Sequence, residues 1–410
     1  METTYRIVNC RWQSGERYRM LVDAETGQPL WWPTLFITTQ LRSAGRSVAT
    51  MEGALRAIHV LLAYAETYGI DLDQRVRSGQ YLALHEVDAL SDSTRRSFDG
   101  RRRRGGTHRA ASVSRAHHYN RLSWIAAYLE WYAHAVRGNG RTRDDDKAIE
   151  TVVKEIRRRR PRWGRGVSTH DRALTDEQCD RLLRVIEPGH PDNPFEDRRA
   201  AERNELAVLM LLWLGVRSGE LLGVQVPDID WQQQWLSIHR RADDPEDPRM
   251  LQPRTKTLAR GVPLFADLIE RIDRYVRGAR RQTKGANSHR YLLVVHRKGP
   301  HEGGPLSVQG LTKVFAALRL CDPVLAGVHP HSLRHTWNLK FSQALDGRPA
   351  NERASPAEEQ QVRSHLMGWQ PGSGTAAVYN QRHISERAQE AARVMYENAK
   401  GNGAQEPSNG

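Results

Sequence analysis

The residues of this sequence whose types and spacing could do chemistry lie between Gly327 and Tyr379. His331 and Arg334 are three positions apart, and side chains at that spacing share one face of a helix. An arginine guanidinium is a planar, permanent cation that suits a phosphate, and a nearby imidazole can donate to the same phosphate or move a proton. Tyr379 could supply a nucleophilic oxygen. Because such a pair also occurs on ordinary helix surfaces, the assignment needs support from elsewhere in the chain.

A second arginine, Arg217, provides that support. The apolar segment before it predicts a helix that ends at Gly215, and Ser218 can begin a new helix with Glu220 in its first turn. An arginine at the end of a buried helix is unfavourable unless it has an anionic partner. We therefore expect Glu220 to hold the turn. Arg217 and Arg334 would then act together as hydrogen-bond donors to a phosphate.

The order of these features along the chain is specific. Between the two arginines, a Thr-Lys-Thr segment predicts a hairpin that carries Lys256, flanked by Arg254 and Arg260. The full series is an arginine in Gly-x-Arg-x-x-Glu-Leu, a hairpin lysine, His-x-x-Arg, a Gly-Trp pair ending at Trp369, and a tyrosine. This series resembles the tyrosine recombinase (phage integrase) family over residues 174–397.

The resemblance implies a site that cleaves DNA through a covalent intermediate and needs no metal. Its catalytic residues would be Arg217, Lys256, His331, Arg334, Trp369 and Tyr379. The two arginines would stabilise charge on the non-bridging phosphate oxygens. The lysine would protonate the leaving 5′ oxygen, and the histidine would donate a hydrogen bond or accept the tyrosine proton. Attack by the tyrosine would give a 3′-phosphotyrosine, which conserves the bond energy for religation.

Some details of the motif depart from the commonest family pattern. Trp369 stands where many relatives carry histidine, and its indole N–H can donate a hydrogen bond but cannot accept a proton. The interval from this residue to Tyr379 is slightly longer than usual, and the glycine-rich segment 371–374 can absorb the difference. Tyr396 is a competing nucleophile but lies beyond the motif. His335 is expected to lie behind the reacting groups.

The bulk charge points to a polyanionic partner. Lysine and arginine number 62 against 48 acidic residues, so the formal net charge is +14. A nucleic acid fits this balance better than a membrane surface does, and the resemblance implies double-stranded DNA. No apolar run approaches the length of about eighteen residues that spans a bilayer, and the N-terminus shows no secretory signal. The sequence thus predicts a cytoplasmic, nucleoid-associated protein with no membrane partner.

The cysteines and histidines give no sign of a metal site. Cys10, Cys179 and Cys321 are far apart and odd in number, which fits a reducing cytoplasm and neither disulfides nor zinc. The 17 histidines include no pair with convincing ligand spacing. We therefore expect no metal and no cofactor.

Composition and periodicity predict a mainly α (α+β) fold of several parts. They are a β-rich N-terminal extension at 1–40, a helical core-binding domain at 41–150, a basic linker at 151–172, a mixed catalytic domain with a small antiparallel sheet at 173–400, and a disordered tail at 401–410. Strands are expected at 5–8, 17–22, 235–239 and 292–296, and long helices at 47–70, 118–136, 196–213 and 307–318. The acidic segment 243–248 opposes DNA in sign and is expected to point away from it.

Two arginine-rich runs are candidates for DNA contact. They comprise Arg101, Arg102, Arg103, Arg104, Arg157, Arg158, Arg159 and Arg160. The first run lies in a glycine-containing loop and the second in the predicted linker, and arginines there could neutralise backbone phosphates. The alternative for both runs is a solvated loop or spacer.

These features together predict a site-specific DNA recombinase or integrase of a mobile element. The resemblance also implies self-association on DNA as a tetrameric synaptic complex, with the predicted helix 385–398 docked on a neighbouring subunit; packing on its own domain is the alternative. Two other functions remain open. One is a type IB topoisomerase-like nicking and closing enzyme, and the other is a catalytically silent architectural DNA-binding protein.

Overall fold

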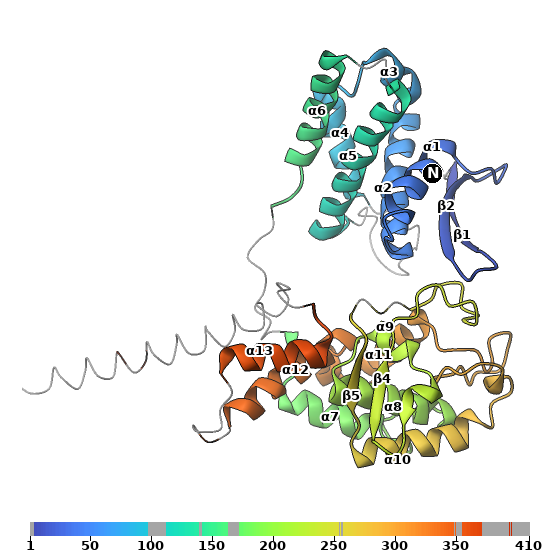
Figure 1. Cartoon of the computed structure of the whole chain (residues 1–410), viewed down its shortest axis with the longest axis vertical. Coiled ribbons are helices and arrows are strands. Elements are labelled where there is room, and N and C mark those ends of the chain that lie inside the picture. The colour runs from blue at the N-terminus through green and yellow to red at the C-terminus, as the bar shows by residue number, and fades with distance from the viewer. Residues whose placement is uncertain are drawn as a thin grey trace, which may run out of the picture. The chain divides into compact units, whose positions relative to one another are not determined.

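The computed structural model describes residues 4–96, 112–138, 142–162, 172–253, 255, 257–347, 349, 355–370, 393 and 395. The chain separates into two compact units, Met1–Arg165 and Gly166–Gly410 (Figure 1). Each has its own cluster of buried apolar side chains. The predicted tail at 401–410 lies outside the described residues.

The first unit begins with an antiparallel hairpin. Strand β1 (Tyr5–Arg11) pairs with β2 (Arg17–Asp23), which extends both strands predicted from the sequence. Tyr18 and Leu21 of β2 are buried in the same core as the helices that follow, and the Tyr18 hydroxyl lies 2.7 Å from Thr38 Oγ1. The hairpin is therefore built into the helical core and is not a separate appendage.

The remainder of this unit is helical. Its elements are α1 (Trp31–Phe36), the π-helix η1 (Ile37–Arg42), α2 (Val48–Thr67), α3 (Leu72–Ser78), α4 (Leu84–Arg95), α5 (Arg115–Arg137) and α6 (Arg143–Arg158). The Ser47 hydroxyl accepts from Thr50 N and caps α2, as its position in the sequence predicts. Helix α6 runs well into the segment predicted as a linker, because Ile149, Val153 and Ile156 pack in the core. The ordered helical unit thus continues beyond residue 150.

Helix α2 has the length and composition of a membrane span, contrary to the expectation from the sequence. Its mean hydropathy is 1.2 over an 18-residue window, but half of that window is buried inside the unit. Leu55, Ile58 and Leu61 are fully buried, and α2 packs along α5. In this structure α2 is the core helix of the first unit.

The second unit combines helices with one small sheet. Its helices are α7 (Asp176–Ile186), α8 (Arg198–Leu214), α9 (Ser218–Gly223), η4 (Val226–Asp228), α10 (Ala266–Tyr275), η5 (Val276–Arg280), η6 (Ala286–Ser288), α11 (Val308–Cys321), η7 (Pro323–Leu325), α12 (Pro330–Asp346) and α13 (Pro356–Met367). The sheet has the antiparallel order β3 (Ile229–Asp230), β4 (Trp235–Ile238) and β5 (Arg260–Pro263). A mainly helical chain with small antiparallel sheets confirms the predicted fold class.

One expectation for this unit is wrong. Residues 292–296 do not form a strand, because this segment takes part only in isolated bridges, such as Val294 with Pro305. The acidic segment 243–248, which is expected to point away from DNA, carries one internal carboxylate. Asp247 is fully buried and binds Arg249, whose Nη1 donates to two backbone carbonyls of the core. The carboxylate is internal because it balances a buried guanidinium.

The end of α8 requires glycine. Gly215 caps the helix with φ 60°, a left-handed conformation that disfavours other residues. A Cβ on Gly215 would also lie 2.8 Å from the ring of Trp337 and 3.0 Å from Met367 Cε. Because glycine has no side chain, the turn from α8 into α9 can pack closely against Trp337 of α12 and Met367 of α13.

Candidate active site

Arg217 lies in the turn between α8 and α9. Its backbone N–H donates to Glu220 Oε2 over 3.0 Å, and its Nη1 lies 3.3 Å from Glu220 Oε1. The Glu220 side chain is fully buried, whereas the Arg217 side chain is 28% exposed. Glu220 thus fixes the turn, as expected from the sequence, and leaves part of the Arg217 guanidinium accessible to a ligand.

Arg334 approaches the same place from α12. Its side chain is almost completely buried. Nη1 donates to the carbonyl oxygen of Gly215 over 2.5 Å, and Nη2 donates to that of Met367 over 3.2 Å. The guanidinium carbon lies 5.8 Å from the ring centroid of Trp369. Arg334 therefore joins the ends of α8 and α13 and brings a fixed positive charge against the tryptophan.

His331 and His335 form an edge-to-face pair on α12. Their ring centroids are 4.4 Å apart, with planes at 70°. The pKa of His331 is lowered, first by partial desolvation and then by Arg334 and other cations that include Arg217. Burial, and then His331, lowers the pKa of His335 to about 4. Both imidazoles are therefore neutral at pH 7, and a neutral His331 can accept a proton.

The segment after Lys256 is anchored to the Arg217 turn. Thr257 Oγ1 donates to Glu220 Oε1 over 2.6 Å, and Arg260 Nη2 donates to Glu220 Oε2 over 2.8 Å. Burial by itself would raise the pKa of Glu220, but Arg260 and then Arg334 hold it below the ordinary value. This carboxylate is therefore ionised at neutral pH.

Trp369 follows the C-terminus of α13. It is 6% exposed, packs with Met367 and Trp337, and its backbone N–H donates to the Ser364 carbonyl over 2.9 Å. Gly368, which precedes it, has φ 61° and accepts a hydrogen bond from Leu258 N over 3.0 Å. The end of α13 is therefore joined to the segment that follows Lys256.

The structure thus brings four of the six predicted catalytic residues to one place. Arg217, His331, Arg334 and Trp369 meet where the turn after α8, helix α12 and the end of α13 adjoin. Lys256 and Tyr379 lie outside the described residues, as do Arg254 and Tyr396. Arg260, a cation that flanks Lys256 in the sequence, has a buried side chain, and nothing in its local sequence signals this burial.

Of the arginines proposed for DNA contact, only those of the second run lie within the described residues. Arg101 to Arg104 lie outside the described residues. In the second run, Arg157 pairs with Glu130 at 2.7 Å, Arg159 pairs with Asp88 at 2.5 Å, and the Arg160 guanidinium lies 4.9 Å from the Tyr119 ring centroid. Arg158 has a longer contact, 3.7 Å to Glu155, and its side chain is 79% exposed. Of the second run, Arg158 is thus the most accessible to a phosphate.

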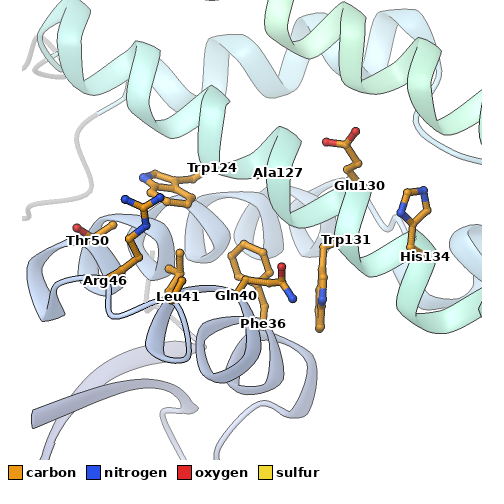
Figure 2. A pocket seen from close by; sticks show the side chains of 11 residues that line it. Phe36, Gln40, Leu41, Arg46, Thr50, Trp124, Ala127, Glu130, Trp131 and His134 are labelled. Atoms are coloured by element: carbon orange, nitrogen blue, oxygen red, sulfur yellow. The ribbon is translucent and has the colours of Figure 1, made fainter. Parts of the chain in front are cut away.

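Two pockets have no candidate catalytic residue in their lining. Figure 2 shows the first, of about 690 Å³, where Trp124 and Trp131 of α5 face Phe36 and Leu41. The second, of about 480 Å³, is lined by apolar residues of α7, α8 and α12, by Phe265, and by the charged residues Asp180, Asp267 and Lys340. Trp124 and Trp131 are partly buried and pack on the core of the first unit. Across the described parts of the chain, no three His, Cys, Asp or Glu side chains cluster as metal ligands would.

Comparison with known sequences identifies the second unit. Residues 172–345 match the phage integrase family. The Tn916 transposase of Enterococcus faecalis is 27% identical over 178 residues, which cover 42% of this chain and 41% of that protein. The Tn1545 transposase of Streptococcus pneumoniae gives the same values. The match therefore spans less than half the length of these relatives.

Solved structures of related enzymes resemble the chain over a larger part of its length. The XerA recombinase shares 14% identity, with 88% of this chain and 97% of that chain covered and a TM-score of 0.34. The Tn1549 transposon integrase in complex with circular intermediate DNA shares 14% identity, with 73% and 81% covered and a TM-score of 0.43. The matched stretch, residues 172–345, includes Arg217, His331 and Arg334 and belongs to the phage integrase (tyrosine recombinase) family.

Proposed function

We propose that this protein is a site-specific DNA recombinase or integrase of a mobile element. The observation that carries the proposal is the convergence of Arg217 and Arg334 beside a neutral His331, within the stretch that matches the family. Two guanidinium groups suit the non-bridging oxygens of one phosphodiester. The likeness to transposases of Tn916 and Tn1545 supports a mobile element as the source of the substrate.

The proposed cleavage step is a transesterification. The hydroxyl oxygen of Tyr379 attacks phosphorus, and the bond from phosphorus to the 5′ oxygen breaks. His331 accepts the tyrosine proton, and Lys256 donates a proton to the leaving 5′ oxygen. Arg217 and Arg334 stabilise the charge that develops on the non-bridging oxygens, and Trp369 packs against Arg334.

Rejoining is the reverse of this step. A 5′ hydroxyl attacks the 3′-phosphotyrosine, returns its proton to Lys256, and releases Tyr379, which regains the proton held by His331. One phosphodiester is exchanged for another, so the cycle needs no external energy source. Because the arginines and lysine supply the positive charge, we expect cleavage to continue in EDTA.

Double-stranded DNA is the proposed partner. The net charge of +14 supports a polyanionic substrate. In this proposal residues 41–150 act as the core-binding half of a DNA clamp and residues 173–400 as the catalytic half, joined by a basic linker. Assembly would be a tetramer on DNA, with the segment 385–398 contacting a neighbouring subunit. A DNA substrate places the protein inside the cell, on the nucleoid.

The experiment that tests the function traps the covalent intermediate. The substrate is a DNA duplex with a nick close to the cleavage position. After attack by the tyrosine, the short fragment that carries the released 5′ hydroxyl diffuses away, so religation is blocked and the adduct accumulates. We expect an adduct in EDTA, mapped by mass spectrometry to Tyr379. An adduct on Tyr396, or no adduct on DNA that carries the ends of the element, would contradict the proposal. Relaxation of supercoiled DNA without any specific site would favour the topoisomerase alternative.

A further inference from the structure

Arg260 is a buried arginine outside the set assigned above to catalysis. It lies at the start of β5, and its side chain is 2% exposed. Each nitrogen of its guanidinium contacts a different segment. Nη2 donates to Glu220 Oε2 over 2.8 Å, Nη1 donates to Thr257 Oγ1 over 3.2 Å, and Nε donates to the Leu366 carbonyl oxygen over 2.6 Å.

These three segments are the ones that carry candidate catalytic residues. Glu220 holds the turn of Arg217, Thr257 follows Lys256 directly in the sequence, and Leu366 lies three residues before Trp369. We propose that Arg260 is a positioning residue for DNA cleavage, which sets the Arg217 turn against the end of α13 and against the segment after Lys256. This inference rests on the proposed function.

Glu220 shows how closely the parts are coupled. Its Oε1 lies within hydrogen-bond distance of Arg217 Nη1 and Thr257 Oγ1, and its Oε2 accepts from the Arg217 backbone and from Arg260. The contact to the Arg217 guanidinium is the longest of the four, at 3.3 Å. Arg260 thus supplies the main balancing charge for the buried carboxylate. Without it, Glu220 would draw Arg217 inward and away from a phosphate.

The surroundings also require the fork of an arginine. A Cβ on Gly368 would lie 2.7 Å from Arg260 Nη1, so the guanidinium fits closely under this glycine. A lysine could replace the charge beside Glu220, but its single ammonium cannot reach Glu220, Thr257 and the Leu366 carbonyl in the geometry of three separate nitrogens. Arg260→Lys therefore keeps the positive charge that balances Glu220 but loses the hydrogen bonds that position the three segments.

The test compares Arg260→Lys with Arg280→Lys in the full chain. Arg280 is also buried, and its guanidinium donates to the carbonyls of Ala286, His289 and Tyr291, none of which is a candidate site residue. Both variants lose a buried fork and are expected to melt at similarly lowered temperatures. At saturating DNA, we expect Arg260→Lys to cleave the nicked substrate about tenfold or more slowly, since small displacements of reacting groups reduce rates strongly. Arg280→Lys should cleave like the parent, and both should bind DNA like the parent.

A second pair of variants leaves the charges intact. Thr257→Val removes the hydroxyl that bridges Glu220 and Arg260, whereas Thr257→Ser retains it. We expect the valine variant to cleave several times more slowly at saturating DNA and the serine variant to match the parent. If Arg260→Lys does not fold, the comparison of Thr257→Val with Thr257→Ser tests the proposal by itself.

The outcomes separate the two proposals. A parent that forms no tyrosine adduct overturns the proposed function and this inference with it. A parent that forms the adduct while Arg260→Lys or Thr257→Val cleaves at the parental rate overturns the inference only. Equal slowing of Arg260→Lys and Arg280→Lys would also overturn it, because a general loss of stability would then account for the effect.

Discussion

Arg334 donates a hydrogen bond to the carbonyl oxygen of Gly215, across 119 positions of sequence. The carbonyls at the end of a helix lack partners within that helix, so the guanidinium completes the C-terminus of α8. The same contact places a cation beside the turn that presents Arg217. The Arg334 side chain therefore both stabilises the fold and is a candidate hydrogen-bond donor to the phosphate.

Arg217→Ala and Arg334→Ala are expected to differ in stability but not in their effect on cleavage. Each should slow cleavage at saturating DNA by about a hundredfold or more, the scale for the loss of one transition-state donor. Arg334→Ala should also lower the free energy of unfolding by about 2 kcal/mol or more, because buried carbonyls lose their donor. Arg217 is partly exposed, so its replacement should leave stability nearly unchanged. Urea denaturation and single-turnover cleavage measure the two effects, and equal stability losses would contradict the different burial of the two arginines.

Tyr379→Phe should abolish the covalent adduct while DNA affinity stays at the parental level. The substitution removes only the nucleophilic oxygen and leaves the charged groups in place. Adduct formation and electrophoretic mobility shifts measure the two properties. Tyr396→Phe is the matched control and should form the adduct normally; a persistent adduct in Tyr379→Phe would exclude Tyr379 as the nucleophile.

Gly215→Ala should destabilise the second unit. The alanine must adopt a left-handed φ and place its Cβ against the Trp337 ring, which together should cost about 2 kcal/mol or more. Gly278→Ala is the control, because its φ is not positive and no atom lies within 4 Å of the added Cβ. Thermal melting should separate the two variants clearly. Equal melting temperatures would show that the α8–α9 turn can accommodate a side chain.

The buried imidazole of His335 should make stability depend on pH in a defined window. Its pKa is about 4 in the fold against 6.5 for an ordinary histidine, so the unfolded chain binds the proton more readily. Stability is therefore expected to fall as pH drops from 6.5 to 4, by up to about 3 kcal/mol, and to be level above 6.5. His335→Gln should show a shallower decline across this window. Identical pH profiles for parent and variant would indicate that the pKa of His335 is the same in the folded and the unfolded chain.

Cleavage should show its own dependence on pH through His331. Its pKa is also lowered, so the neutral form that accepts the tyrosine proton persists at pH 7. The rate at saturating DNA should fall as pH drops below the ordinary histidine range and the imidazole becomes protonated. In His331→Gln this acid limb should disappear along with most of the rate. An acid limb that survives in the variant would belong to another group.

The salt dependence of DNA binding should distinguish accessible arginines from paired ones. Arg158→Gln should lower the slope of log K against log salt by about 0.9 if this exposed side chain neutralises one phosphate. Arg159→Gln should change the slope less and stability more, because Arg159 is paired with Asp88. Glutamine at all four positions 101–104 should lower the slope further without changing cleavage at saturating DNA. Unchanged slopes would favour the solvated-loop alternative.

Local rules account for much of what the sequence predicts correctly. Ser47 caps α2 because its side chain immediately precedes a run of periodic apolar residues, and the Thr175 hydroxyl caps α7 in the same way. Gly215 ends α8 as the sequence predicts, because this glycine interrupts the apolar segment and Ser218 begins a new helix three residues later. The motif arginines and histidine come together because each lies at the end or start of a helix in the second unit.

Contacts between distant segments account for what the sequence does not predict. The burial of Arg260 depends on a carbonyl 106 positions away, and that of Asp247 depends on where Arg249 points. Residues 292–296 have the composition of a strand, and they exchange single backbone hydrogen bonds with residues 303–306 and with Val224, but these form isolated bridges and no continuous ladder. Side-chain placement of this kind follows from tertiary packing and has no local pattern.

Glu220 also constrains how this protein can change over generations. Because Arg217, Thr257 and Arg260 share one carboxylate, the effect of replacing any of them depends on the other two. Random substitution and selection for recombination should therefore recover compensated combinations of these positions more often than independent single changes. A library that varies these three positions together should show strong epistasis. Substitutions at positions such as Gly278, which has open space around it, should have effects that are independent of the rest of the chain.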